Sequence, residues 1–199
     1  MSVTELNVEL FHQINDLGKE YSVANPAIIF IAEYMVYVLA LIVLVIWFTR
    51  VQKNRVMVIS AGIAFIVAEI LGKVAGKLHS NQQPFAELAN VNQLIEKAVD
   101  NSFPSDHTIL FFSFCFTFFL FGKRLGVLWI LLACLVGVSR IWVGVHYPAD
   151  VAVGAFIAMV SAFVAYLVVP KLKVINQLLA FYEKIEQMVL PTKMKTKDF

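Results

Sequence analysis

The sequence predicts an all-α integral membrane protein with about five transmembrane helices in a bundle. Of its 199 residues, 60% are hydrophobic and 15% are charged, whereas soluble domains carry roughly 25% charged residues. The mean hydropathy is +0.77. A net charge of +2 is too small to indicate a nucleic-acid partner, and the basic residues cluster at the ends of apolar runs. Membrane lipids are therefore the expected surroundings of most of the chain.

Five apolar runs approach the roughly 20 residues that an α-helix needs to cross a bilayer. They occupy residues 27–48, 56–76, 104–121, 126–145 and 150–170. The third run is the shortest, so we expect it to tilt less or to begin in the polar surface layer. Cys115 and Cys134 fall inside apolar runs, which favours buried small side chains over a disulfide or a metal site.

Three further segments are predicted to be amphipathic helices at the membrane surface. Apolar residues recur at helical spacing in residues 3–17 and again in residues 172–189. The connection 77–101 is longer than most connections in a compact domain. We expect it to hold a third amphipathic helix at about residues 86–99.

The basic residues predict the orientation, because Lys and Arg in loops stay on the cytoplasmic side. They are frequent in the connections 49–55 and 122–125 and in the C-terminal tail, and sparse near the N-terminus and in the connection 77–101. Five spans then place the C-terminus inside and the connections after the second and fourth spans outside. The chain is expected to be one domain with an N-terminal interfacial segment, a transmembrane core and a cytoplasmic tail (residues 1–26, 27–170 and 171–199).

The first outer connection ends in the residues Pro104, Ser105, Asp106 and His107. A helix that begins here presents free N–H groups and the positive end of its dipole, which suit a phosphate. Ser105 adds a hydroxyl donor and His107 adds a titratable proton. Alternatively, Ser105 or Asp106 only caps the helix and His107 lies among the lipid headgroups.

The second outer connection reads SRIWVGVHYPAD and contains the polar residues Ser139, Arg140, His146 and Asp150. Gly144 and Pro148 interrupt a continuous helix, so the segment can fold back and bring Arg140 and His146 into one pocket. Asp150 is expected within reach of His146, where a carboxylate can fix the tautomer and support a positive imidazole. Two polar connections on one side of the membrane favour a functional site over simple capping.

These side chains are the ones that phosphoryl transfer requires. Arginine and N–H donors match the charge that spreads over the oxygens of the transition state. A neutral imidazole can attack phosphorus, and a carboxylate behind it stabilises the cation that forms. A second histidine can donate a proton to the leaving group and later activate water.

The motifs PSDH and SRIWVGVHYPAD resemble the second and third signature motifs of the type-2 phosphatidic acid phosphatase superfamily. The stretches NSFPSDHT and SRIWVGVHYP, the short chain and the five spans are most similar to bacterial undecaprenyl-diphosphatases linked to bacitracin resistance. The resemblance implies that His146 is the nucleophile, forming a phosphohistidine, that Asp150 orients it and that His107 is the general acid. It also implies a mechanism without a metal or other cofactor, and phosphate contacts from Ser105, Asp106, Ser139 and Arg140.

The first motif of that family fits this chain poorly. The family has Lys, six residues and then Arg-Pro, with both cations on phosphate. Here Gln83 stands at the Arg position and Gly76 at the Lys position, with Lys77 one step further on. Gln83 can donate a hydrogen bond but brings no charge. We expect Lys77 and Gln83 to bind phosphate, with Lys77, His79 or Asn81 replacing the missing charged contact, although Lys77 also fits a surface lysine at a helix end.

Two acidic residues lie inside the predicted spans, where charge is costly. Glu69 is four residues before Lys73, so we expect the two to pair on one helix face, with contact to the diphosphate or to a lipid headgroup as the alternative. Glu33 has no partner nearby in the sequence and, near the outer end of the first span, could reach the pocket.

The sequence therefore predicts a membrane phosphatase for a polyprenyl diphosphate, undecaprenyl diphosphate first, with phosphate released outside. A phosphatase for phosphatidylglycerol phosphate or phosphatidic acid would differ only in its substrate. A component of a transporter is the alternative that is not an enzyme, and the acidic residues within the spans and Lys73 favour it. Five spans without an inverted repeat speak against it.

Overall fold

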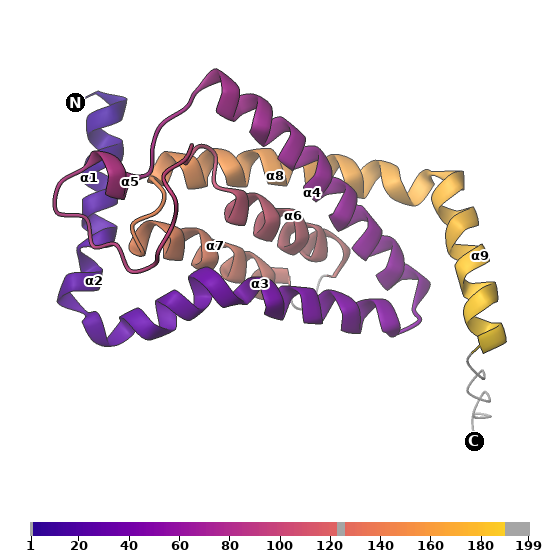
Figure 1. The fold of residues 1–199 in the computed structure, drawn as a ribbon. Helices are drawn as coiled ribbons and strands as arrows, with labels where there is room; N and C mark the ends of the chain where they lie inside the picture. Colours follow the sequence, from indigo (N-terminus) through magenta and orange to yellow (C-terminus); the bar gives the residue numbers. More distant parts are fainter. Residues whose placement is uncertain (1, 123–125, 190–199) are drawn as a thin grey trace.

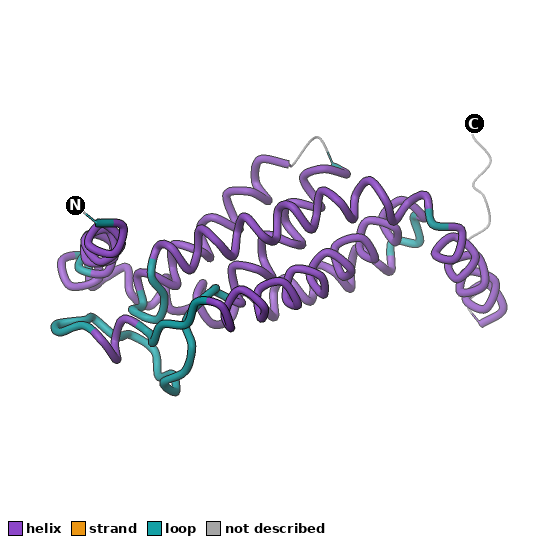
Figure 2. Tube along the Cα trace, turned by 90° about the horizontal axis from the view of Figure 1, so that it is seen from above, coloured by secondary structure: helices purple, strands orange, loops and turns teal. Residues whose placement is uncertain are grey.

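The computed structural model describes residues 2–122 and 126–189, and within them every regular element is a helix (Figures 1 and 2). The bundle consists of α3 (Asn25–Phe48), α4 (Gln52–Leu78), α6 (Asp106–Phe121), α7 (Gly126–Trp142) and α8 (Pro148–Val168). Each lies on one of the five apolar runs, so the predicted all-α membrane fold is confirmed. The basic turn at residues 123–125 and the tail from residue 190 lie outside the described residues.

The five bundle helices differ in length. Three helical stretches are long and apolar enough to cross a membrane, namely Ser22–Phe48, Gln52–Leu78 and Pro148–Lys171. Helices α6 and α7 have only 16 and 17 residues, and at 1.5 Å per residue they are shorter than a hydrocarbon core of about 30 Å. Helix α6 packs against α4, α7 and α8, so the shortest helix lies inside the bundle.

Small residues let α4, α6 and α8 approach closely. Ala64 of α4 and Ala162 of α8 are both fully buried in one cluster. A Cβ atom added to Gly72 of α4 would lie 2.7 Å from Ile109 Cδ1 of α6, and one added to Gly154 of α8 would lie 3.1 Å from the Ser105 carbonyl oxygen. Close backbone approach of this kind is how membrane helices gain packing energy without a hydrophobic effect.

The two predicted terminal helices are present at opposite ends of the bundle (Figure 1). Helix α1 (Val3–Asn15) buries Phe11 against Ile141 and Tyr147. Helix α9 (Lys173–Val189) is held by Arg55, whose Nη2 lies 2.6 Å from Glu186 Oε2. Its apolar residues Leu178, Phe181, Ile185 and Met188 remain exposed, which suits a helix at a lipid surface.

The prediction of an amphipathic helix at about residues 86–99 is wrong. Only the single turn α5 (Pro84–Glu87) is helical there, and the chain from residue 88 to residue 105 has no regular structure. Contacts with distant residues replace the bonds that a helix would make. Asn15 Nδ2 donates to the Asn92 carbonyl at 3.0 Å, the Asn92 N–H donates back to Asn15 Oδ1 at 2.8 Å, and the Leu94 N–H donates to the Val143 carbonyl at 3.1 Å.

Candidate active site

One open cavity of about 360 Å³ lies where α3, α6, the end of α7 and the connection 88–105 meet. Its nitrogen-bearing side chains are those of Lys97, His107, Arg140 and His146, and its carboxylates are those of Glu33, Glu96, Asp100 and Asp106. The two histidines that the sequence singled out therefore share one cavity, although they come from separate connections. Figure 2 shows that the long loops gather at this end of the bundle, beside α1.

The start of α6 is tied to the start of α8. Ser105 is the N-cap residue of α6, and its N–H donates to the Asp150 carbonyl at 3.2 Å. This bond joins the two sequence motifs directly. The buried Ser105 hydroxyl accepts a hydrogen bond from Thr108 Oγ1 at 3.0 Å, which leaves its own hydrogen for another acceptor. Asp106 and His107 follow in the first turn of α6 and line the cavity.

The chain folds back after α7, as Gly144 and Pro148 predicted. Gly144 has φ +86°, and the Val145 N–H donates to the Arg140 carbonyl at 3.2 Å. That turn carries His146 back beside Arg140 in the cavity wall. Arg140 Nη1 donates to the Ala32 carbonyl of α3 at 2.7 Å, while its buried Nε finds no partner within residues 2–122 and 126–189. The guanidinium is thus fixed on one side and has a donor left for a ligand.

His146 and Asp150 form a buried pair. Nδ1 of His146 lies 3.5 Å from Asp150 Oδ2, which is an ion-pair separation and longer than a good hydrogen bond. Burial lowers the pKa of His146, and Lys97 and Arg140 lower it further, whereas Asp150 opposes them. The net direction is downward, so His146 is neutral at neutral pH and its ring can act as a nucleophile.

Asp150 is itself held by two donors. Its Oδ2 accepts from Ser102 Oγ at 2.7 Å and from the Tyr147 N–H at 2.9 Å. Asn81 Nδ2 donates to Ser102 Oγ at 2.8 Å, so a chain of hydrogen bonds runs from the end of α4 to the carboxylate behind His146. Ser102 lies inside the stretch NSFPSDHT, but nothing in its spacing distinguished it from a loop serine.

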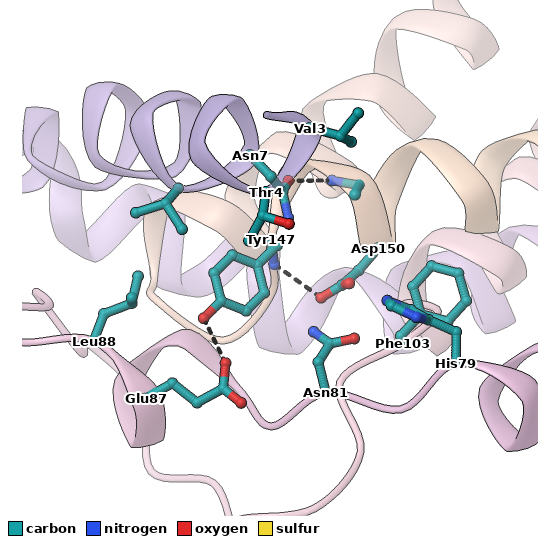
Figure 3. Close-up of a pocket in the computed structure, with 12 residues that line it drawn as sticks. Val3, Thr4, Asn7, His79, Asn81, Glu87, Leu88, Phe103, Tyr147 and Asp150 are labelled. Carbon is teal, nitrogen blue, oxygen red and sulfur yellow. Dashed lines mark hydrogen bonds between the residues drawn. The ribbon is translucent and has the colours of Figure 1, made fainter. Parts of the chain in front are cut away.

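A second cavity, of about 390 Å³, is lined by Asp150 and by residues of α1 and of the connection after α4 (Figure 3). Helix α1 forms one wall, where Asn7 Oδ1 accepts from the Ala149 N–H at 2.9 Å. Opposite, the Tyr147 hydroxyl donates to Glu87 Oε2 at 3.0 Å. These bonds brace the first turn of α8, which carries Asp150.

Besides Ser105, three predicted phosphate ligands lie apart from the residues that line the cavity. Gln83 is fully buried, and its amide bonds the backbone of Ala98 and Asp100 as well as the Asp100 carboxylate. Ser139 is buried and donates within its own helix to the Val136 carbonyl at 2.6 Å. Lys77 is exposed near the end of α4. The structure uses the first two in packing and leaves the third at the surface.

Of the intramembrane acids, Glu33 reaches the cavity, as its place near the outer end of the first span allowed. Glu69 and Lys73 lie on α4, but no salt bridge joins them among the described residues. The expected pair on one helix face is therefore not formed.

Lys97 lines the cavity, as do its neighbours Glu96 and Asp100, and none of the three was predicted from the sequence. Lys97 stood out only as one of two lysines in the connection 77–101. Its position depends on the irregular path of that connection, for which the sequence had predicted a helix. Burial lowers the pKa of Lys97, and Asp100 opposes this effect.

Residues 57–173 match the model of the PAP2 superfamily. The chain belongs to the PAP2 superfamily. The family resemblance seen in the two histidine motifs is thus confirmed, and with its membrane-length helices the protein is a multi-pass membrane protein. The matched region begins inside α4, so α3, which supplies Glu33 to the cavity, lies outside it.

Two curated relatives and one solved structure are similar to this chain. Bacitracin transport permease protein BcrC of Bacillus licheniformis is 61% identical over 198 residues, which cover 100% of this chain and 98% of that protein. Undecaprenyl-diphosphatase BcrC of Bacillus subtilis is 33% identical over 161 residues, covering 81% and 83% of the two chains. The crystal structure of Aquifex aeolicus LpxE superposes with a TM-score of 0.69 at 27% identity, covering 80% of this chain and 94% of that one.

Proposed function

We propose that this protein hydrolyses undecaprenyl diphosphate to undecaprenyl phosphate and inorganic phosphate on the outer face of the cell membrane. The observation that carries the proposal is that His107, His146 and Arg140 line one cavity. The name of the Bacillus subtilis relative supports the choice of substrate. Removal of the diphosphate would leave less of the target of bacitracin, so resistance to that antibiotic follows from the same reaction.

In the first step, the neutral His146 ring attacks the terminal phosphorus of the diphosphate. A nitrogen–phosphorus bond forms as the bond from that phosphorus to the bridging oxygen breaks. His107 donates its proton to the bridging oxygen, and undecaprenyl phosphate leaves. Asp150 stabilises the positive ring of the phosphohistidine, while Arg140 and the N–H groups at the start of α6 stabilise the charge on the transferring oxygens.

In the second step, His107 is neutral and accepts a proton from water. The resulting hydroxide attacks the phosphorus on His146, the nitrogen–phosphorus bond breaks and inorganic phosphate leaves. Both histidines then return to their starting protonation states. Each step uses side chains of this chain alone, so we expect turnover to continue in EDTA.

The test is phosphate release by the purified full-length protein in detergent, offered undecaprenyl diphosphate, phosphatidylglycerol phosphate and phosphatidic acid in parallel, with and without EDTA. We expect the highest kcat/KM with undecaprenyl diphosphate. His146→Ala should reduce kcat by at least about a thousandfold, as the loss of a nucleophile does in other hydrolases. Lys184→Ala, on the exposed surface of α9, is the matched control. Normal phosphate release by the His146 variant would contradict the proposal.

A transporter is the second candidate, because the relative at 61% identity is named a transport permease. Sealed vesicles separate the two functions. Flux of bacitracin across the vesicle membrane without release of phosphate would favour transport, whereas phosphate release without flux would favour the phosphatase.

A further inference from the structure

The cavity poses a charge problem for an anionic substrate. Four carboxylates face it, and only Lys97 and Arg140 bring a permanent positive charge. One amino group of Arg140 already donates a hydrogen bond to the Ala32 carbonyl. A diphosphate bound beside the histidines therefore needs a second cation, and Lys97 is the available one.

The segment around Lys97 is anchored on both sides. On one side, Ile95 is buried in a cluster with Val143 and Val145, next to His146. On the other side, Gln83 Nε2 donates to the Ala98 carbonyl at 3.4 Å, and the Asp100 N–H donates to Gln83 Oε1 at 3.0 Å. The backbone at residue 97 is thus held against the cavity wall although it belongs to no helix.

The Lys97 side chain is half-buried, yet within residues 2–122 and 126–189 its ammonium makes no hydrogen bond or salt bridge. A structural lysine at such a site is normally paired, because burial of an unpaired charge is costly. Burial accordingly lowers the pKa of Lys97. A phosphate in the cavity would supply the missing partner and favour the charged form of the side chain.

We propose that Lys97 is a phosphate-binding residue that contacts the diphosphate of the substrate, and that Gln83 is a positioning residue that holds the segment bearing Lys97. This inference rests on the proposed phosphatase function. Gln83 is buried and uncharged, so it brings no positive charge to the cavity. Its side chain instead holds the backbone of Ala98 and Asp100, which follow Lys97 in the chain.

Lys97→Gln tests the proposal, because it keeps most of the side-chain length and removes only the charge. The full-length variant is purified in detergent and assayed for KM with undecaprenyl diphosphate and for product inhibition by inorganic phosphate. We expect both constants to rise about tenfold or more, as for the loss of one hydrogen bond to a charged group. Lys97→Arg should restore at least half of the phosphate affinity, and Lys184→Ala should match the wild type.

Failure of this inference differs from failure of the proposed function. If the wild type hydrolyses undecaprenyl diphosphate and Lys97→Gln keeps both constants within twofold, Lys97 is not a ligand and the inference is overturned. If the wild type releases no phosphate from any lipid, calorimetric titration with inorganic phosphate decides on Lys97 alone. Weaker binding by a Lys97→Gln protein with an unchanged unfolding temperature then supports the inference, and equal binding overturns it.

Discussion

At the scale of single residues, His146 is a buried imidazole set between one carboxylate and two cations. Burial, Lys97 and Arg140 lower its pKa, and Asp150 raises it. The charged and titratable groups that face it across the cavity are Glu33, Glu96, Lys97, Asp100, Asp106, His107 and Arg140. The neutral ring is the nucleophile, so the protein gains activity as pH rises through the pKa of His146, and it loses activity again at higher pH, where His107 gives up the proton that it must donate to the leaving group.

The pH profile of kcat/KM should therefore have its acidic limb below pH 6.5, the usual pKa of histidine. Lys97→Gln removes one of the cations that depress the pKa of His146, so its acidic limb should move to higher pH. Initial rates between pH 5 and pH 8, with Lys184→Ala as the control, measure the displacement. An acidic limb that stays in place or moves to lower pH in the Lys97 variant would show that the two charges do not interact.

At the scale of elements, the connection from α4 to α6 depends on Gln83. Its side-chain amide forms hydrogen bonds with the backbone of Ala98 and Asp100 and with the Asp100 carboxylate. Gln83→Ala removes the side chain that fixes this part of the loop and leaves Lys97 intact. We expect KM for the diphosphate and the inhibition constant of inorganic phosphate to rise in the same direction as in Lys97→Gln, by severalfold, with kcat less affected.

Gln82→Ala is the matched control for that variant, because Gln82 is the exposed neighbour and its side chain makes no hydrogen bond within the described residues, where its backbone N–H donates to Glu87. It should bind phosphate like the wild type. Phosphate affinity equal to wild type in Gln83→Ala would mean that other contacts, such as the buried Ile95, suffice to place Lys97.

The helices could be predicted because lipid leaves the backbone few choices. A segment without water must satisfy its own N–H and C=O groups, so long apolar runs become helices. The fold-back after α7 was equally local, since Gly144 and Pro148 mark it in the sequence. The path of residues 88–105 is not determined by neighbouring residues in the sequence. It is set by bonds such as that between Asn15 and Asn92, which are 77 positions apart.

The same difference between local and long-range contacts explains which residues of the site could be predicted from the sequence. Arg140, His146 and Asp150 lie in one short stretch of chain, from the last turn of α7 to the first turn of α8, so their spacing predicted their proximity. Lys97 and Gln83 owe their places to the irregular connection, and no periodicity in the sequence reports on it. The type of a residue can suggest that its side chain binds phosphate, but the path of the loop decides whether that side chain reaches the cavity.

At the scale of the whole molecule, the cavity and the basic loop between α3 and α4 lie at opposite ends of the bundle. Arg50 lies in the turn between α3 and α4, and Arg55 lies near the start of α4. Glu186 of α9 contacts both arginines, and Glu183 of α9 contacts Arg55. Helix α1 and the connection from α4 to α6, whose residues Lys97 and Asp100 line the cavity, lie at the other end (Figure 1). Because basic loops stay in the cytoplasm, this polarity supports the proposed orientation, with the cavity open to the outside.

Cysteine labelling in intact cells tests that orientation. Cys115 is buried and Cys134 is exposed on α7, so both are first replaced by serine to give a background without thiols. A single cysteine is then placed at Gln82, in the connection beside the cavity, or at Lys184 on α9, both of which are exposed. A membrane-impermeant maleimide should label Gln82→Cys in intact cells and Lys184→Cys only after permeabilisation. The reverse pattern would place the histidines in the cytoplasm, where they could not act on a diphosphate presented at the outer face.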